Sequence, residues 1–233
     1  LQISSSGEVL DILLDRKSTP KNVLEVFEGV LCPGFINAHC HLELSHLNAL
    51  ADKKKGLLDF ITKIQQRDSF HKDDIFAAID KAEKEMLKNG IVAVGDICNT
   101  TDTLPQKQKG NLQYYNFIEV FGVKDSNANR IIVEGKKLRD KFRKLNLKAT
   151  ISPHAPYSVS QKLMQEISGI FDLKDGLLTV HMQETPYENE LFKNKQGEFL
   201  VWLKSMQASS SIWKKRKKST DIFSELNIKN VLS

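Results

Sequence analysis

Apolar residues recur along this chain with two alternating spacings, and this alternation predicts strands separated by helices. Short apolar runs predict strands at residues 29–37, 91–97, 114–121, 147–152, 177–182 and 228–232. Apolar residues three or four positions apart predict helices at residues 56–67, 73–89, 128–145, 160–171, 185–204 and 220–226. Strands joined through helices pair in parallel with right-handed crossovers, so we expect an α/β fold. Two apolar runs within residues 1–15 flank Ser6-Gly7, which predicts a β-hairpin ahead of the α/β part.

Polar residues discriminate between the two common parallel architectures. The Gly-rich turn of a doubly wound dinucleotide fold has no counterpart, because the sequence contains neither GxGxxG nor GxxxxGK[ST]. Histidines and a carboxylate stand instead where predicted strands end: His39, His41, His154, His181 and Glu184. In a (β/α)8 barrel this end of the strands carries the catalytic residues. The sequence therefore favours a TIM-type barrel.

The pair His39 and His41 is a candidate metal site. Residues two apart in a strand point to the same face, about 7 Å from one another. Two such imidazoles can converge on a zinc ion at about 2.0–2.1 Å. Taken alone, an HxH pair is more often two surface or core histidines. The apolar segment with its Pro33-Gly34 bend, directly before the pair, favours the metal site.

Three further residues extend this candidate site. His181 ends an apolar run, and Glu184 follows three residues later. A histidine ligand beside a carboxylate that transfers protons is what metal-assisted hydrolysis requires, although a buried core histidine fits the same pattern. His154 lies between Pro153 and Pro156, which rigidify its turn, and a plain turn histidine is the alternative there.

Composition excludes several classes of protein. Hydrophobic residues at 40% and charged residues at 27% are typical of a globular chain. No apolar stretch reaches the length of a transmembrane helix, and the first residues lack the pattern of a signal peptide. The cysteines, Cys32, Cys40 and Cys98, form no CxxC pair, which argues against a disulfide framework or a Cys-zinc site and favours the cytoplasm. The chain does not start with Met, so we expect its beginning to be missing.

The net charge of +5 comes from one run, Lys214 to Lys218, and the remainder of the chain is balanced. A general basic field for nucleic acid is therefore absent. The run itself is either a local phosphate-binding patch or, as we expect, a solvated loop.

Three segments resemble one known family. They are PGFINAHCHLELSHL, ISPHAPYSVS and VHMQETPYENELF, which occur in the order and with the spacing of that family's motifs. The sequence is similar to the metal-dependent amidohydrolase superfamily, in its aminohydrolase branch of cytosine deaminase, triazine hydrolase and adenosylhomocysteine deaminase type. The resemblance spans residues 30–192, and residues 1–29 resemble part of the small β-sandwich that accompanies the barrel.

The resemblance implies a role for each matching position. His39, His41 and His181 correspond to metal ligands, Glu184 to the proton shuttle, and His154 to the residue that contacts substrate or the attacking hydroxide. Glu43 and His46 lie where such enzymes shape the substrate pocket, with a surface role as the alternative. The implied cofactor is one divalent ion, zinc with iron or manganese as alternatives. Lys148 stands at the wrong end of its strand to bridge two metals.

The resemblance also implies features that this sequence lacks. The family continues with a histidine at strand six and an aspartate at strand eight, yet no histidine follows His181. We therefore expect a barrel with strands one to six only, in which residues 1–29 form part of the β-sandwich and residues 30–233 a barrel domain truncated at its C-terminal end.

The implied function is a hydrolase that deaminates a cyclic amidine-like substrate, such as an aminopurine or a pyrimidine, and releases ammonia. The expected partner is a small heterocyclic molecule, without a membrane, and assembly of identical chains stays open. Two alternatives remain. One is a catalytically inactive relative that binds without turnover, and the other is a nucleic-acid-binding protein that uses Lys214 to Lys218.

Overall fold

The computed structural model describes residues 1–13, 25–47, 56–64, 69–171 and 176–225. The chain divides into two compact units, Leu1–Pro33 and Gly34–Ser233. In the first unit, β1 (Gln2–Ile3) and β2 (Val9–Asp11) pair antiparallel. Gly7 adopts a φ of +85° in the turn between them, a conformation that a residue without a side chain adopts freely. The predicted hairpin is thus confirmed within the described residues, and residues 14 and 15 lie outside them.

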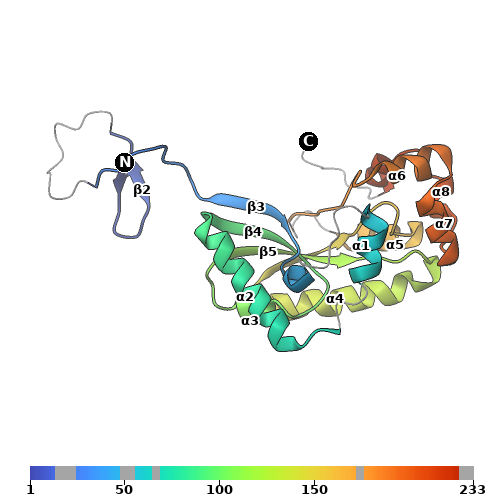
Figure 1. Cartoon of the computed structure of the whole chain (residues 1–233), viewed down its shortest axis with the longest axis horizontal. Helices are drawn as coiled ribbons and strands as arrows, with labels where there is room; N and C mark the ends of the chain where they lie inside the picture. The colour runs from blue at the N-terminus through green and yellow to red at the C-terminus, as the bar shows by residue number, and fades with distance from the viewer. Residues whose placement is uncertain (14–24, 48–55, 65–68, 172–175, 226–233) are drawn as a thin grey trace. The chain divides into compact units, whose positions relative to one another are not determined.

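The second unit is built on a parallel sheet of four strands in chain order: β3 (Phe35–Cys40), β4 (Ile91–Cys98), β5 (Gln113–Val120) and β6 (Lys148–Pro153). Figure 1 shows β3, β4 and β5 side by side, and all four strands pair in parallel. The predicted α/β class and these four strands are confirmed.

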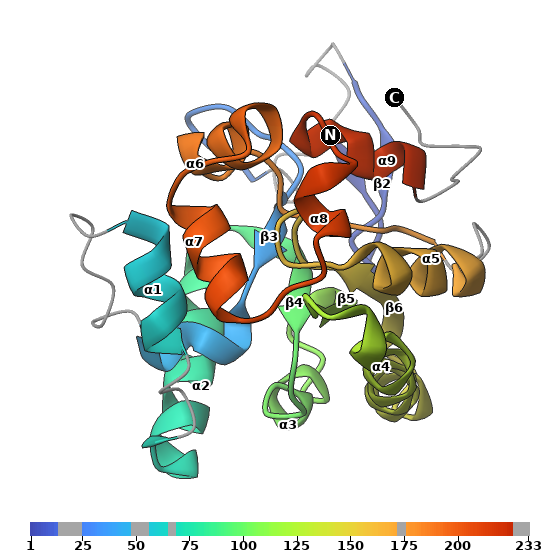
Figure 2. The ribbon, with the colours of Figure 1, turned by 90° about the vertical axis from the view of Figure 1, so that its right-hand side faces the viewer.

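The helices between the strands pack on the sheet through apolar stripes. In α2 (Lys72–Lys88), the residues Ile75, Ile79 and Met86 are buried against β4 and β5. The helices α4 (Ala128–Lys144) and α5 (Gln161–Ile170) bury a second apolar cluster against β5 and β6. Figure 2 shows α2, α3 and α4 along one side of the strands. Between β4 and β5 the helix α3 (Leu104–Lys107) has only four residues, and the apolar pattern did not predict it.

The part of the chain after His181 forms a separate layer of short helices. They are α6 (Pro186–Asn189), the π-helical turn η6 (Glu190–Asn194), α7 (Glu198–Ser205), α8 (Ser211–Lys214), the 3-10 turn η7 (Ser219–Asp221) and α9 (Ile222–Glu225). The predicted helix at residues 185–204 is interrupted because Lys195 and Gly197 adopt positive φ values of +56° and +91°. Helix α1 (Gly56–Ile64) packs with this layer through Leu57 and Ile61.

Two predicted strands are not found: one segment forms no strand, and the other lies outside the described residues. Residues 177–182 run beside β6 but form no strand. Two of their contacts with β6 are made by side-chain hydroxyl groups: Thr150 donates to Leu177 O (2.8 Å), and Ser152 accepts from Thr179 N (3.3 Å). The backbone bond from His181 N to His154 O (2.7 Å) fixes the end of the segment. The prediction of strands one to six is therefore wrong for the fifth strand, and the sixth, at residues 228–232, falls outside the described residues. Within those residues no helix is long and apolar enough to cross a membrane.

Candidate functional site

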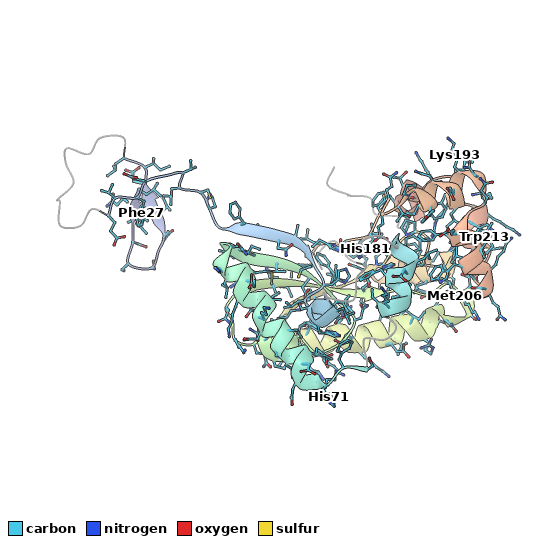
Figure 3. All side chains as sticks on the ribbon, viewed as in Figure 1. Phe27, His71, His181, Lys193, Met206 and Trp213 are labelled. Carbon is cyan, nitrogen blue, oxygen red and sulfur yellow. The ribbon has the colours of Figure 1, made fainter. Side chains whose placement is uncertain are left out.

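The five predicted site residues come together at the C-terminal ends of the parallel strands. His39 belongs to β3 and His41 follows that strand directly, whereas His154 follows β6. His181 and Glu184 come from the extended segment beside β6 and the loop after it. Figure 3 shows His181 near the tips of the strands.

Three imidazoles form the centre of the site. The ligand atoms of His39, His41 and His181 all lie within 4.8 Å of one another. The His41 and His181 Nε2 atoms are 3.3 Å apart. Four nitrogen ligands in a tetrahedron around zinc, each at 2.0–2.1 Å, are separated by about 3.3–3.4 Å. The spacing and the nitrogen donors therefore fit a divalent ion.

Close packing of β3 on β4 sets the position of the first two histidines. A Cβ atom on Gly95 of β4 would stand 2.5 Å from Ala38 O, so only glycine permits this approach. Just after β3, Leu42 N donates a hydrogen bond to Asp96 Oδ1 (2.8 Å) and so fixes the path of the following loop. Asp96 is fully buried and forms an ion pair with Lys107 Nζ (2.5 Å), which is also buried. Lys107 in turn donates to Asn116 Oδ1 (2.6 Å).

Glu43 belongs to the framework of this loop and not to the surface. Its side chain accepts hydrogen bonds from Asn99 N (3.0 Å), Thr100 N (2.9 Å) and Thr100 Oγ1 (2.8 Å), and the residue is 3% exposed. Burial raises the pKa of Glu43 to about 6. His46 packs edge-on against Phe70 at a ring distance of 5.0 Å. Of the two alternatives for Glu43, the surface role is therefore excluded, and Glu43 joins the ends of β3 and β4.

Contacts at the Nδ1 atom and at the backbone nitrogen orient His154. Its Nδ1 lies 2.6 Å from Ser158 Oγ, and its backbone N donates to Val120 O (3.0 Å). Its ring centre is 4.9 Å from that of His181. With Nδ1 engaged by Ser158, Nε2 is the nitrogen left for a ligand.

Glu184 is held between two partners. Its Oε1 lies 3.4 Å from His181 Nδ1, and its Oε2 accepts a 2.6 Å hydrogen bond from the buried Tyr157 hydroxyl. Gln183 adopts a φ of +56°, which turns the chain between His181 and Glu184. Glu184 N donates to Glu188 Oε1 (2.8 Å), and Glu188 Oε2 accepts from Ser219 Oγ (2.7 Å).

Glu119 also faces this site, although the sequence reasoning did not single it out. It lies near the end of β5, its side chain is 6% exposed, and its Oε1 is 3.4 Å from His181 Nε2. The signal that could have found it is the same one that found the others: a carboxylate where a predicted strand ends.

Electrostatics favour neutral imidazoles at most of these positions. Burial lowers the pKa of His41 to about 4 and also lowers the pKa of His39 and of His154. Burial acts in the same direction on His181, but the Glu119 carboxylate outweighs it and raises the pKa of His181 above its usual value. Conversely, the neighbouring histidines hold the pKa of Glu119 below its usual value despite burial.

The site opens into a cavity of about 1240 Å³. His41, His154, His181 and Glu184 line it on the side of the strands, and Phe60 and Trp202 contribute apolar walls from α1 and α7. Small-molecule sites are usually concave, about 300–1000 Å³, and mostly apolar with a few convergent polar groups. The cavity is large enough for a nucleoside-sized ligand.

The basic run Lys214 to Lys218 contains one residue that takes part in this framework. Arg216 is 1% exposed and donates to Pro156 O and to Val159 O (3.3 Å) in the loop that carries His154. Lys195 donates in turn to Arg216 O. The expectation of a solvated loop is wrong for Arg216, because its guanidinium is buried and engaged with the loop after β6. The remaining members of the run are exposed.

Comparison with known proteins gives a consistent picture. The family model described as "Amidohydrolase family" matches residues 30–209. The chain is 30% identical over 178 residues to an adenosine deaminase of Helicobacter pylori, covering 75% of this chain and 43% of that protein. It is 25% identical over 215 residues to an aminodeoxyfutalosine deaminase of a Nitratiruptor species, covering 91% and 53%. The chain thus spans about half the length of these relatives.

Solved structures show the same likeness. The aminofutalosine deaminase of Helicobacter pylori in complex with methylthio-coformycin superposes with a TM-score of 0.63 at 25% identity, covering 77% of this chain and 44% of that chain. The atrazine chlorohydrolase of Arthrobacter aurescens complexed with zinc and atraton, in a mutant form, gives a TM-score of 0.59 at 14% identity, covering 83% and 46%. At that identity the second likeness concerns the fold alone.

Proposed function

The chain belongs to the amidohydrolase family, and from this membership we propose that it forms the metal-binding part of a deaminase that acts on an adenosine-like substrate. The observation that carries the proposal is the convergence of His39, His41 and His181 beside Glu184. The relatives are named as deaminases of adenosine, aminodeoxyfutalosine, methylthioadenosine or 5'-deoxyadenosine. Adenosine and deoxyadenosine share a purine ring with an exocyclic amino group, which is the group that hydrolysis would release as ammonia.

We propose further that the four parallel strands are part of a (β/α)8 barrel, accompanied by a small β-sandwich to which residues 1–29 belong. Support comes from the position of all the candidate residues at the C-terminal ends of the strands, where catalytic residues of such barrels lie. The likeness to the aminofutalosine deaminase structure supports the same architecture.

In the proposed reaction each residue has a separate task. His39, His41 and His181 hold a divalent ion, zinc by preference with iron or manganese as alternatives. When bound, such an ion lowers the pKa of a bound water to about 7. Glu184 accepts a proton from the attacking water and delivers it to a ring nitrogen of the substrate, while Tyr157 keeps the carboxylate in place through its 2.6 Å hydrogen bond.

His154 orients the attacking water through Nε2, since Ser158 engages its Nδ1. The water oxygen adds to the ring carbon that carries the amino group, and the C–N bond to that group then breaks. The amino group takes the second proton of the water and leaves as ammonia, while the ring keeps a carbonyl and the proton on its nitrogen. One proton acceptor thus serves both proton steps.

The test is Glu184→Gln, which retains the size of the side chain and removes the base. We expect kcat for ammonia release from adenosine, 5'-deoxyadenosine or methylthioadenosine to fall about 10²- to 10⁴-fold, because general acid–base catalysis contributes that much. Zinc content, measured by plasma mass spectrometry, should stay unchanged. Glu198→Gln, an exposed carboxylate at the start of α7, is the matched control. A kcat within tenfold of the parent would remove Glu184 from the mechanism, and absence of ammonia release from every adenosine-like substrate would refute the deaminase proposal.

A further inference from the structure

The Ser158 hydroxyl group contacts two atoms of its own loop. Its Oγ lies 2.6 Å from His154 Nδ1 and donates to Ala155 O at 3.2 Å. Ser158 is 5% exposed, so water competes little for these contacts. Because the same loop carries His154, the direction of the two hydrogen bonds decides what this imidazole offers to a ligand.

A hydroxyl group has one hydrogen, and a neutral imidazole also carries one, on Nδ1 or on Nε2. If Ser158 gives its hydrogen to Ala155 O, Oγ can only accept from His154 Nδ1, and Nε2 keeps a lone pair. If Ser158 gives its hydrogen to His154 Nδ1, the bond to Ala155 O is lost and the ring carries its hydrogen on Nε2. Only the first arrangement forms both bonds, and buried polar groups in native proteins are nearly always hydrogen-bonded.

The backbone around Ser158 is fixed by groups other than the imidazole. Gly122 N donates to Ser158 O (2.9 Å). The buried Arg216 guanidinium donates to the carbonyl groups of Pro156 and Val159, one on each side of Ser158. The hydroxyl oxygen is therefore held beside Nδ1 by the framework of the loop, whether or not a ligand is bound.

With Nδ1 turned to Ser158, Nε2 is the nitrogen of His154 that is left for the site. His154 and Glu184 line the same cavity. A water molecule that reaches both groups can give one hydrogen to Glu184 and the other to a lone pair on Nε2, which leaves its oxygen lone pairs free to attack. A hydrogen on Nε2 would instead bind one of those lone pairs and compete with the attack.

We propose, on the basis of the function proposed above, that Ser158 is a positioning residue that holds His154 in the tautomer with hydrogen on Nδ1, so that Nε2 accepts a hydrogen bond from the attacking water. Ser158 acts through His154 alone and takes no proton during the reaction. A neighbouring group favours the opposite tautomer: a Glu119 carboxylate oxygen lies within 4.8 Å of a His154 ring nitrogen and could accept a hydrogen from Nε2. Removal of the Ser158 hydroxyl should therefore move the hydrogen to Nε2.

Nitrogen NMR of the chain with ¹⁵N-labelled histidine, at neutral pH with Zn²⁺ present, detects this hydrogen without any turnover. We expect Nδ1 of His154 to have the chemical shift of a nitrogen that bears hydrogen, and Nε2 that of a nitrogen without one. The His154 signals are identified by their absence from His154→Gln. Ser158→Ala should move the hydrogen to Nε2, whereas Ser158→Thr, which retains the hydroxyl, should keep the parent pattern. Ser45→Ala is the matched control, because Ser45 also donates to the carbonyl three residues earlier, Leu42 O (2.7 Å).

Ammonia release gives the second measurement. We expect Ser158→Ala to lower kcat roughly 2- to 10-fold, as loss of one hydrogen bond of ordinary strength does, with KM nearly unchanged. A parent with its hydrogen on Nε2, or a Ser158→Ala variant with the parent pattern, would overturn the role of Ser158 even if kcat falls. If Ser158→Ala does not fold, the parent and Ser158→Thr spectra still decide the tautomer. If the parent releases no ammonia from any adenosine-like substrate, the proposed function fails, and the nitrogen spectra still show whether Ser158 sets the tautomer.

Discussion

The loop after β3 and the loop after His181 meet at one site, and different kinds of partner hold each of them. Asp96 anchors the first loop by accepting from Leu42 N, and the buried Lys107 balances its charge. Glu188 anchors the second loop by accepting from Glu184 N. Among the described residues, the Glu188 carboxylate also accepts from two uncharged groups, the Ser219 hydroxyl and the Gln183 backbone amide.

This difference matters because a buried carboxyl group without a cation nearby keeps its proton to a higher pH. Burial raises the pKa of Glu188 above its usual value, and the hydrogen bonds from Ser219 and the backbone offset only part of that shift. The first loop is thus fixed by a full ion pair in the interior, whereas the second depends on hydrogen bonds that one proton can alter. We expect the loop that carries Glu184 to be the more adjustable of the two.

Lys107→Met should have the largest effect. It removes the cation and leaves the Asp96 carboxylate buried without compensation, which costs about 3–5 kcal/mol of unfolding free energy. Lys109→Met is the matched control, because Lys109 is exposed, its ion pair with Asp80 lies at the surface, and such pairs contribute about 0–1 kcal/mol. Urea unfolding of both variants measures the difference. Equal losses would show that the Asp96 pair does not fix the first loop.

Ser219→Ala should have an intermediate effect on the second loop. It removes the 2.7 Å hydrogen bond to the buried Glu188 carboxylate, and bonds to charged groups contribute about 1.5–3 kcal/mol. Ser224→Ala is the control, since Ser224 donates to a backbone carbonyl at an exposed position. The same unfolding experiment applies, and a loss as large as that of Lys107→Met would erase the contrast between the loops.

Glu188→Gln should have the smallest effect at neutral pH, about 1 kcal/mol or less, because the amide oxygen still accepts from Glu184 N and the amide NH2 group can donate to the Ser219 hydroxyl, which rotates to accept. Its informative consequence is in the pH dependence. The folded protein holds the Glu188 proton to a higher pH than the unfolded chain does, so this residue makes the free energy of unfolding fall as pH rises above its usual pKa of 4.5. Glu188→Gln should remove that decline. An unchanged profile between the parent and the variant would contradict the role of a proton at this loop.

The fold could be predicted from the sequence wherever apolar spacing decides it. The Ile75–Ile79–Met86 stripe predicted a helix at residues 73–89, and the apolar run after Gly90 predicted a strand at residues 91–97. The structure has them at residues 72–88 and 91–98. The segment at residues 177–182 was predicted as a strand because it is apolar, but its bonds to the Thr150 and Ser152 hydroxyls could not be anticipated from spacing. The predicted β-sandwich and the sixth strand stay predictions.

The candidate site shows the same division. His39, His41, His154, His181 and Glu184 could be found because their motifs stand at strand ends, and the structure brings them together. Lys107 and Arg216 could not be identified as buried, since isolated charged residues usually face water and only the tertiary fold supplies their partners. Glu119 stands near the end of a predicted strand, so its position could have indicated it. For Arg216, the four exposed neighbours in the basic run concealed the one buried position.

The clamp that Arg216 makes has a consequence for the order in which the site is completed during synthesis. Arg216 reaches back 60 residues to Pro156 and 57 residues to Val159. At about 5–20 residues per second, the ribosome adds Arg216 roughly 3–12 seconds after Pro156. During that interval β3 to β6 are already made, but the Pro156 and Val159 carbonyl groups still lack the guanidinium as a partner. The loop that carries His154 is therefore completed by a guanidinium that is synthesised after the sheet, so a ribosome that pauses after β6 would leave this loop without two of its final contacts.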